Sequence, residues 1–130
     1  MSASPESPEA VARAFADAIN RQSPDELAAM MTEDHLFIDA LDNRVQGREA
    51  MRAAWRGYYR LVPDYTITVE EAYGVGDVVV MLGTAQGTTN GGWWQTPAAW
   101  RAEIRGSQIG AWRVYADNEP IRKLLANQPK

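Results

Sequence analysis

Apolar residues in the first half of the chain recur every three or four positions, which is the spacing of one helix face. This pattern predicts a first helix over about residues 8–21, with a serine cap and an early proline at its start. Ser23 and Glu26 have the spacing of a capping box, which indicates a short second helix. A third helix is predicted from Arg48 to the residue before Pro63, since proline cannot continue a helix.

Beyond this helix the apolar residues alternate with polar ones, which is the period of a strand with one buried face. Turns rich in glycine separate the strands, and Asn90-Gly91-Gly92 is a strong hairpin signal. A further strand at 35–40 lies between the second and third helices, and a short C-terminal helix is predicted from Asn118. The four later strands are expected at about 65–73, 77–89, 93–105 and 109–117.

This order predicts an α+β fold, in which three N-terminal helices cover one face of a mainly antiparallel sheet. We expect one domain over residues 8–126, after a disordered tail of residues 1–7. The sheet must curve to cover three helices, and Gly83 and Gly87 permit this. A curved sheet closed by helices leaves a cone with an open end, where a small-molecule site is expected.

Asp39 is the sharpest anomaly in the sequence, because it ends an otherwise apolar strand. Strand residues two apart share a face, so His35, Phe37 and Asp39 point the same way. A buried carboxylate is costly unless it is paired. Two interpretations follow: Asp39 caps the turn after the strand, or it is a functional group inside the cone.

The composition excludes several classes of site. The chain has no cysteine and one histidine, which argues against thiolate sites and His-rich zinc sites, and we expect no metal or cofactor. The net charge of −4, without a basic run, argues against nucleic acids and anionic membranes as partners. No apolar stretch has the length of a spanning helix, and the first ten residues are polar, so a cytoplasmic protein is expected.

Four stretches carry a more specific pattern: Ser23–Leu27 leading to Phe37-Ile38-Asp39, Gln46–Met51, Val62–Tyr65 and Trp112–Asp117. Together they resemble the SnoaL-like domains of the NTF2-like superfamily, which also contains ketosteroid isomerase and limonene epoxide hydrolase. The resemblance covers about residues 8–126. It implies a cone in which a curved, mixed sheet wraps around the three helices, followed by a short C-terminal helix.

The resemblance to ketosteroid isomerase places Asp39 at the position of its general base, an Asp that faces a Tyr and a protonated Asp. The Tyr position corresponds to Phe15, which carries no hydroxyl. The second Asp position falls near Ala98, Ala99 or Trp100, none of which is an acid. Two of the three catalytic groups, the Tyr and the second Asp, are therefore missing, so the resemblance does not extend to that mechanism. Tyr58 is the best replacement hydroxyl.

The resemblance to the SnoaL-like cyclases makes Asp117 the match for their catalytic Asp. Strand alternation turns Asp117 away from the cavity if Trp112 faces it, and Asn118 then points inward. For the epoxide hydrolase, Arg101 and Glu103 imitate part of an Asp-Arg-Asp set, but the alternation places both on the solvated face.

The aromatic residues are expected to form the walls of the pocket. His35 is interpreted mainly as a half-exposed structural residue, although it shares the face of Asp39. Trp93 and Trp94 form either a lid or a dimer contact. Arg113 and Tyr115 lie on the outer sheet face, through which the resemblance implies a homodimer. The candidate substrate-binding residues are Phe15, His35, Phe37, Trp55, Trp100, Trp112 and Asn118.

Two hypotheses for the function remain open. The first is a cofactor-free enzyme that moves a proton on an apolar, carbonyl-containing molecule, by isomerisation, aldol-type cyclisation or water addition. Its catalytic residues are Asp39 as base, Tyr58 as hydrogen-bond donor, and Asp117 or Asn118 as a second polar group. The second is a non-catalytic ligand-binding or dimerisation module, in which Asp39 pairs with the backbone or an arginine.

Overall fold

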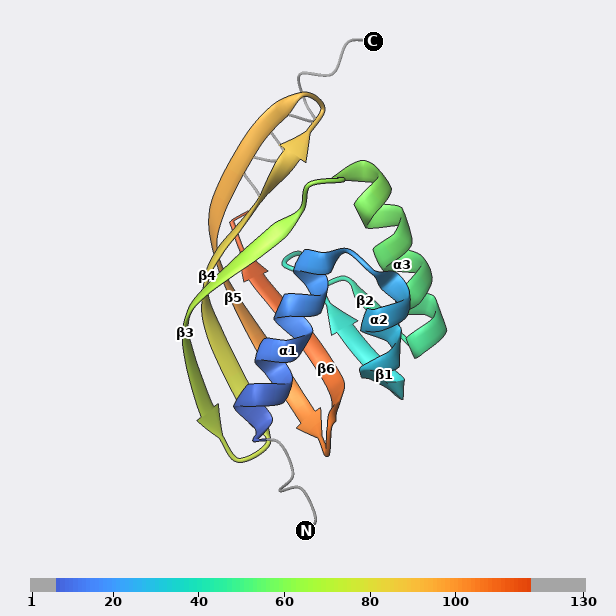
Figure 1. The fold of residues 1–130 in the computed structure, drawn as a ribbon, viewed down its shortest axis with the longest axis vertical. Coiled ribbons are helices and arrows are strands. Elements are labelled where there is room, and N and C mark those ends of the chain that lie inside the picture. The colour runs from blue at the N-terminus through green and yellow to red at the C-terminus, as the bar shows by residue number, and fades with distance from the viewer. Residues whose placement is uncertain (1–6, 118–130) are drawn as a thin grey trace.

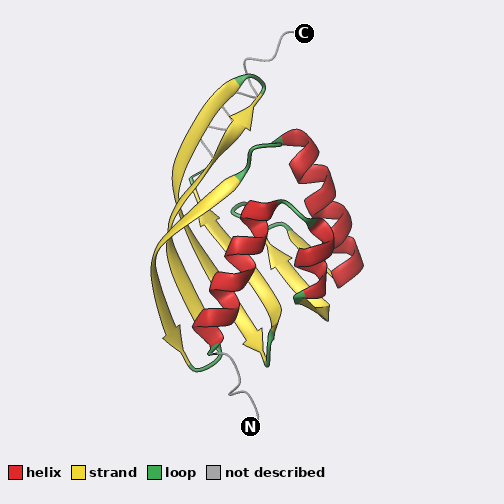
Figure 2. Ribbon diagram, in the orientation of Figure 1, coloured by secondary structure: helices red, strands yellow, loops and turns green. Residues whose placement is uncertain are grey.

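The computed structural model describes residues 7–117, which form one mixed sheet with three helices on one of its faces (Figures 1 and 2). The predicted C-terminal helix and nearly all of the predicted tail lie outside these residues. None of the described helices has the length and apolarity needed to cross a bilayer. The elements are α1 (Pro8–Arg21), α2 (Pro24–Ala29), β1 (Met31–Ile38), β2 (Arg44–Gln46), α3 (Arg48–Leu61), β3 (Thr66–Val75), β4 (Val78–Thr89), β5 (Gly92–Arg105) and β6 (Gln108–Ala116).

The sheet has the strand order β2-β1-β6-β5-β4-β3. Strands β3 to β6 form the predicted antiparallel meander, and β1 pairs in parallel with β6, which makes the sheet mixed. The α+β prediction and all three helices are therefore confirmed. Two local predictions were wrong. The first strand begins at Met31 rather than His35, and the polar turn contains β2, a strand too short to show alternation.

Side chains at the C-terminal end of α1 fix this helix to β3, because they make the backbone hydrogen bonds that a neighbouring strand would otherwise make. The Asn20 amide donates to the Ile67 carbonyl (2.8 Å) and accepts from the Ile67 N–H (2.7 Å). Gln22 donates to the Tyr65 carbonyl at 3.0 Å. These bonds pair backbone groups of the edge strand β3 and of Tyr65, which lies immediately before it, and they set the position of Tyr65.

The core lies between α1 and the inner sheet face, where Trp100 and Trp112 are fully buried. On β5 the apolar residues Trp100, Ala102 and Ile104 are buried, whereas the intervening charged residues lie on the outer face, as the alternation predicted. Phe15 from α1 packs against Trp112 with ring centroids 4.8 Å apart. Burial of each such side chain contributes roughly 1.5–3 kcal/mol, so this contact anchors the helix on the sheet.

Gly83 marks the point where the sheet bends. The pairing of β3 with β4 shifts between Val69 and Glu71, next to Gly83, which is the signature of a β-bulge. A Cβ at Gly83 would overlap the carbonyl group of Thr68. The close approach of β3 therefore requires glycine here, as predicted for the curvature of the sheet.

We expect Gly83→Ala to lower the free energy of unfolding by at least about 1–3 kcal/mol, the usual cost of forcing extra atoms into a packed site. Gly57→Ala is the control, because Gly57 lies in α3 with open space around its Cα. Alanine there should stabilise the protein by up to about 1 kcal/mol. Urea denaturation of both variants measures the difference, and equal stability would contradict the requirement for glycine at Gly83.

Candidate functional site

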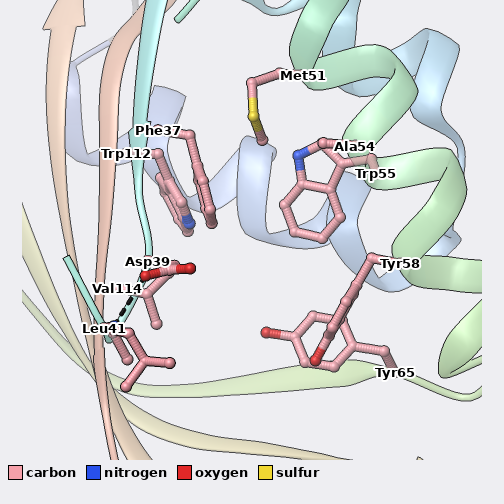
Figure 3. A pocket seen from close by; sticks show the side chains of 11 residues that line it. Phe37, Asp39, Leu41, Met51, Ala54, Trp55, Tyr58, Tyr65, Trp112 and Val114 are labelled. Atoms are coloured by element: carbon pink, nitrogen blue, oxygen red, sulfur yellow. Dashed lines mark hydrogen bonds between the residues drawn. The ribbon is translucent and has the colours of Figure 1, made fainter. Parts of the chain in front are cut away.

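A cavity of about 350 Å³ opens between α3, the end of β1 and the inner sheet face (Figure 3). This volume is in the range of small-molecule sites. Leu41 lines it and is 60% exposed, which places the turn after β1 at the opening. The walls are mainly apolar and aromatic: Phe37, Asp39, Ala40, Leu41, Met51, Ala54, Trp55, Tyr58, Tyr65, Trp112 and Val114.

Asp39 is the acidic residue of this cavity, and it also closes the turn that follows β1. Its Oδ1 accepts hydrogen bonds from the N–H groups of Leu41 and Asn43, both at 2.9 Å. Its Oδ2 accepts from the Asn43 side-chain amide at 3.0 Å. Short polar side chains favour such turns because they bond to the backbone a few residues ahead. Three N–H donors therefore hold the carboxylate in one orientation.

Two tyrosine hydroxyls lie across the cavity from Asp39, one on Tyr58 of α3 and one on Tyr65 before β3 (Figure 3). Their rings meet edge to face with centroids 4.9 Å apart. Burial raises the pKa of Tyr58 to about 12, and it raises the pKa of Tyr65 as well. Both phenols are therefore protonated at neutral pH and can donate hydrogen bonds to a bound molecule.

The structure brings five of the predicted site residues to this cavity: Phe37, Asp39, Trp55, Tyr58 and Trp112. Two others, Phe15 and Trp100, are completely buried and do not line it. Because Phe15 packs on Trp112, side chains fill the cone between α1 and the sheet, and the cavity begins only beyond them.

His35 also lies outside the cavity, and the prediction that it is half-exposed was wrong. Its side chain is completely buried, and Nδ1 lies 2.8 Å from the Ile109 carbonyl oxygen, to which it donates. Burial lowers the pKa of His35, so the ring is neutral at pH 7. The difference arises because β1 begins at Met31, which places His35 inside the strand and next to Phe15.

Asp117 follows β6, is exposed and does not line the cavity. Its backbone carbonyl accepts a hydrogen bond from the Thr96 hydroxyl at 2.9 Å. Asn118 lies outside the described residues. Arg101 and Glu103 form an ion pair at 2.8 Å on the outer face, as the alternation predicted.

Tyr65 was not among the predicted site residues, although it stands in the Val62–Tyr65 motif. Asp64 accepts hydrogen bonds from the N–H and the hydroxyl of Thr88, both at 2.7 Å, and so ties this segment to β4. That contact turns Tyr65 into the cone, but nothing in the alternating pattern distinguishes it from an ordinary core residue. Met51 and Val114 were missed in the same way.

The outer sheet face carries Arg113 and Tyr115, with the guanidinium 5.0 Å from the ring centroid. Asp42, in the Asp39 turn, lies 3.6 Å from Arg113. The homodimer through this face stays a prediction. Within residues 7–117, no group of three His, Asp or Glu side chains is arranged to hold a metal ion.

Solved structures of several proteins share this fold. A candidate SnoaL-like polyketide cyclase from Shewanella denitrificans has a TM-score of 0.82 at 16% identity, over 93% of this chain and 98% of the other. A ketosteroid isomerase-like fold from Catenulispora acidiphila, in complex with trimethylamine, has a TM-score of 0.75 at 23% identity, over 81% and 83%. An LEH-like epoxide hydrolase from M. tuberculosis has a TM-score of 0.79 at 18% identity, over 92% and 89%.

These similarities confirm the predicted NTF2-like cone. No curated protein matches the chain at a significant level. The sequence model of the SnoaL-like domain matches residues 12–117, which is most of the chain and includes every cavity residue. The chain therefore belongs to the SnoaL-like domain family.

Proposed function

We propose that this protein is a cofactor-free acid–base enzyme that acts on a small, apolar, carbonyl-containing molecule. The observation that carries the proposal is the polarity of the cavity: one carboxylate, that of Asp39, faces two protonated phenols across apolar walls. A base and hydrogen-bond donors on opposite sides of a bound carbonyl compound are the groups that proton abstraction next to the carbonyl requires.

In this mechanism an oxygen of Asp39 removes a proton from the carbon next to the carbonyl group. The Oδ2 atom accepts one hydrogen bond from Asn43, which leaves it a lone pair for this proton. The electron pair of the C–H bond moves to the carbonyl oxygen, and Tyr58 and Tyr65 donate hydrogen bonds to the resulting enolate. Asp39 then returns the proton to another carbon, or the enolate carbon attacks a second carbonyl group of the same molecule, whose oxygen takes up the proton from Asp39.

The relatives support a small-molecule substrate. One is named as a candidate polyketide cyclase, another as an epoxide hydrolase, and a third holds trimethylamine. Since these proteins share only the fold with this chain, they support the class of ligand and not a particular reaction.

A second candidate function is a ligand-binding module without chemistry. It is favoured by the three hydrogen bonds that Asp39 accepts, because they account for the carboxylate as a cap of its turn. The resemblance to ketosteroid isomerase also implies that Phe15 takes the place of its phenol, and that Ala98, Ala99 or Trp100 takes the place of its second acid. The two functions differ in whether the Asp39 carboxylate is needed for turnover.

Asp39→Asn is expected to lower turnover by about 10²–10⁴-fold, the usual contribution of a general base. Its remaining oxygen still accepts from Leu41 and Asn43, so the turn and the fold should persist. The measurement is deuterium exchange of the α-protons of a bicyclic enone in D₂O, followed by proton NMR.

Asp42→Asn is the matched control for this experiment. Asp42 lies in the same turn, but it is exposed, does not line the cavity and pairs with Arg44 and Arg113. We expect Asp42→Asn to catalyse deuterium exchange of the α-protons of the enone at the wild-type rate. Equal exchange by the wild type and Asp39→Asn would remove Asp39 from the mechanism and favour the binding module.

The phenol of Tyr58 is expected to weaken the fold at alkaline pH. Its pKa is about 12 in the folded protein and about 10 in an unfolded chain, so above pH 10 the unfolded state releases this proton first. Stability should therefore fall as the pH rises from 10 to 12, by up to about 1.4 kcal/mol per pH unit for this group. Tyr58→Phe removes this contribution, so urea denaturation between pH 9 and about 12 should show a shallower fall. Parallel curves for the two proteins would refute the assignment of a buried, protonated phenol.

A further inference from the structure

The indole N–H of Trp55 is a buried hydrogen-bond donor that the proposed mechanism does not use. Trp55 is 6% exposed, and its Nε1 atom exposes less than 1 Å². Among the residues that the structure describes, no acceptor pairs with it. Buried donors without an acceptor are rare in proteins, because the hydrogen bond lost with water is not replaced.

The indole ring is held in place on several sides. It stacks on Tyr59 with centroids 5.4 Å apart, and the Tyr59 hydroxyl donates to the Ile19 carbonyl at 2.7 Å. Tyr58 contacts it edge to face at 6.2 Å. The ring therefore presents its N–H in a fixed direction, whether or not an acceptor is present.

Figure 3 shows that direction. The indole nitrogen lies on the cavity side of the ring, turned toward Met51 and Phe37, whereas the hydroxyls of Tyr58 and Tyr65 lie at the other end of the same wall. Met51 is 2% exposed, and its thioether end is drawn beside the nitrogen. A methionine side chain is unbranched and adapts easily, so it can uncover the N–H when a ligand enters.

We propose that the Trp55 N–H binds an oxygen acceptor of the substrate at the Met51 end of the cavity. This inference rests on the proposed function and names the class of its substrate: an apolar molecule with two oxygen functions. One is the carbonyl group that reacts near Asp39, and the other is a carbonyl or ether oxygen that Trp55 holds.

The second oxygen should determine specificity. A molecule that lacks it occupies the cavity but leaves the Trp55 donor unpaired, and a site built to make a hydrogen bond discriminates against such an analogue. Trp55 is in this sense a binding residue that orients the substrate, while the bond-breaking step belongs to Asp39.

The test uses two probes of the same shape: a bicyclic enedione, and the bicyclic enone without the second carbonyl group. The full-length protein, labelled with ¹⁵N at its five indoles, reports directly on each N–H. We expect the enedione to move the Trp55 proton resonance downfield, and to bind roughly 3- to 10-fold more tightly than the enone. The Trp94 resonance is the internal reference, since its N–H already donates to Thr89 at 2.8 Å.

Trp55→Phe should bind both probes with equal affinity, because it removes the N–H while keeping an aromatic ring. Trp93→Phe is the matched control, since Trp93 is 62% exposed and lies outside the cavity. If Trp55→Phe does not fold, replacement of Trp55 by 3-benzothienylalanine removes the N–H and preserves the shape of the side chain.

Three results would overturn the proposal: equal affinity of the wild type for both probes, no binding of either, or binding of the enedione without a shift at Trp55. The N–H would then serve only an internal contact, such as one with the Phe37 ring, whose centroid is 6.4 Å from that of Trp55. Deuterium exchange tests the proposed function separately. If the wild type shows no deuterium exchange but the enedione shifts the Trp55 resonance, the proposed enzymatic function is wrong and the binding role of Trp55 stands.

Discussion

The close approach of β3 to β4 at Gly83 is the backbone constraint that accompanies the bend of the sheet. A flat sheet would lie against the helices along its whole length, and its aromatic side chains would fill the space between the two layers. The bulge bends the sheet. Phe15, Trp100 and Trp112 fill one part of the cone, while the part beside α3 stays open.

In the proposed function, Asp39 combines a structural and a chemical role in one side chain. Its three hydrogen bonds stabilise the turn between β1 and β2, and the same bonds fix where the carboxylate lies relative to the cavity. A general base needs this kind of rigid support, because small displacements of a catalytic group lower the rate sharply. The cap and the base are therefore compatible, and the geometry of the turn serves both.

The two ends of the aromatic wall differ in their chemistry. At one end the phenols of Tyr58 and Tyr65 stay protonated through burial, and at the other end the indole of Trp55 presents a donor beside Met51. A mostly apolar cavity gains affinity from its walls and selectivity from a few placed polar groups. The ring contacts that fix these donors connect the packing of α3 directly to the ligand recognition that we propose.

Periodicity and capping residues in the sequence were sufficient to predict α1, α2, α3 and the β3–β6 meander, because these signals act between residues close in the chain. Asp39 stood out for a similar local reason, as an acid at the end of an apolar strand. The sequence pattern also placed Trp100 on a buried face, but it could not separate a core residue from a cavity wall. That distinction depends on how far Phe15 and its neighbours fill the cone, which only the packing of α1 against distant strands determines. Contacts between distant residues likewise decide that Tyr65 lines the cavity and His35 does not. Asn20, Gln22 and Thr88 hold the segment that contains Tyr65. The hydrogen bond to Ile109 holds His35 in the core.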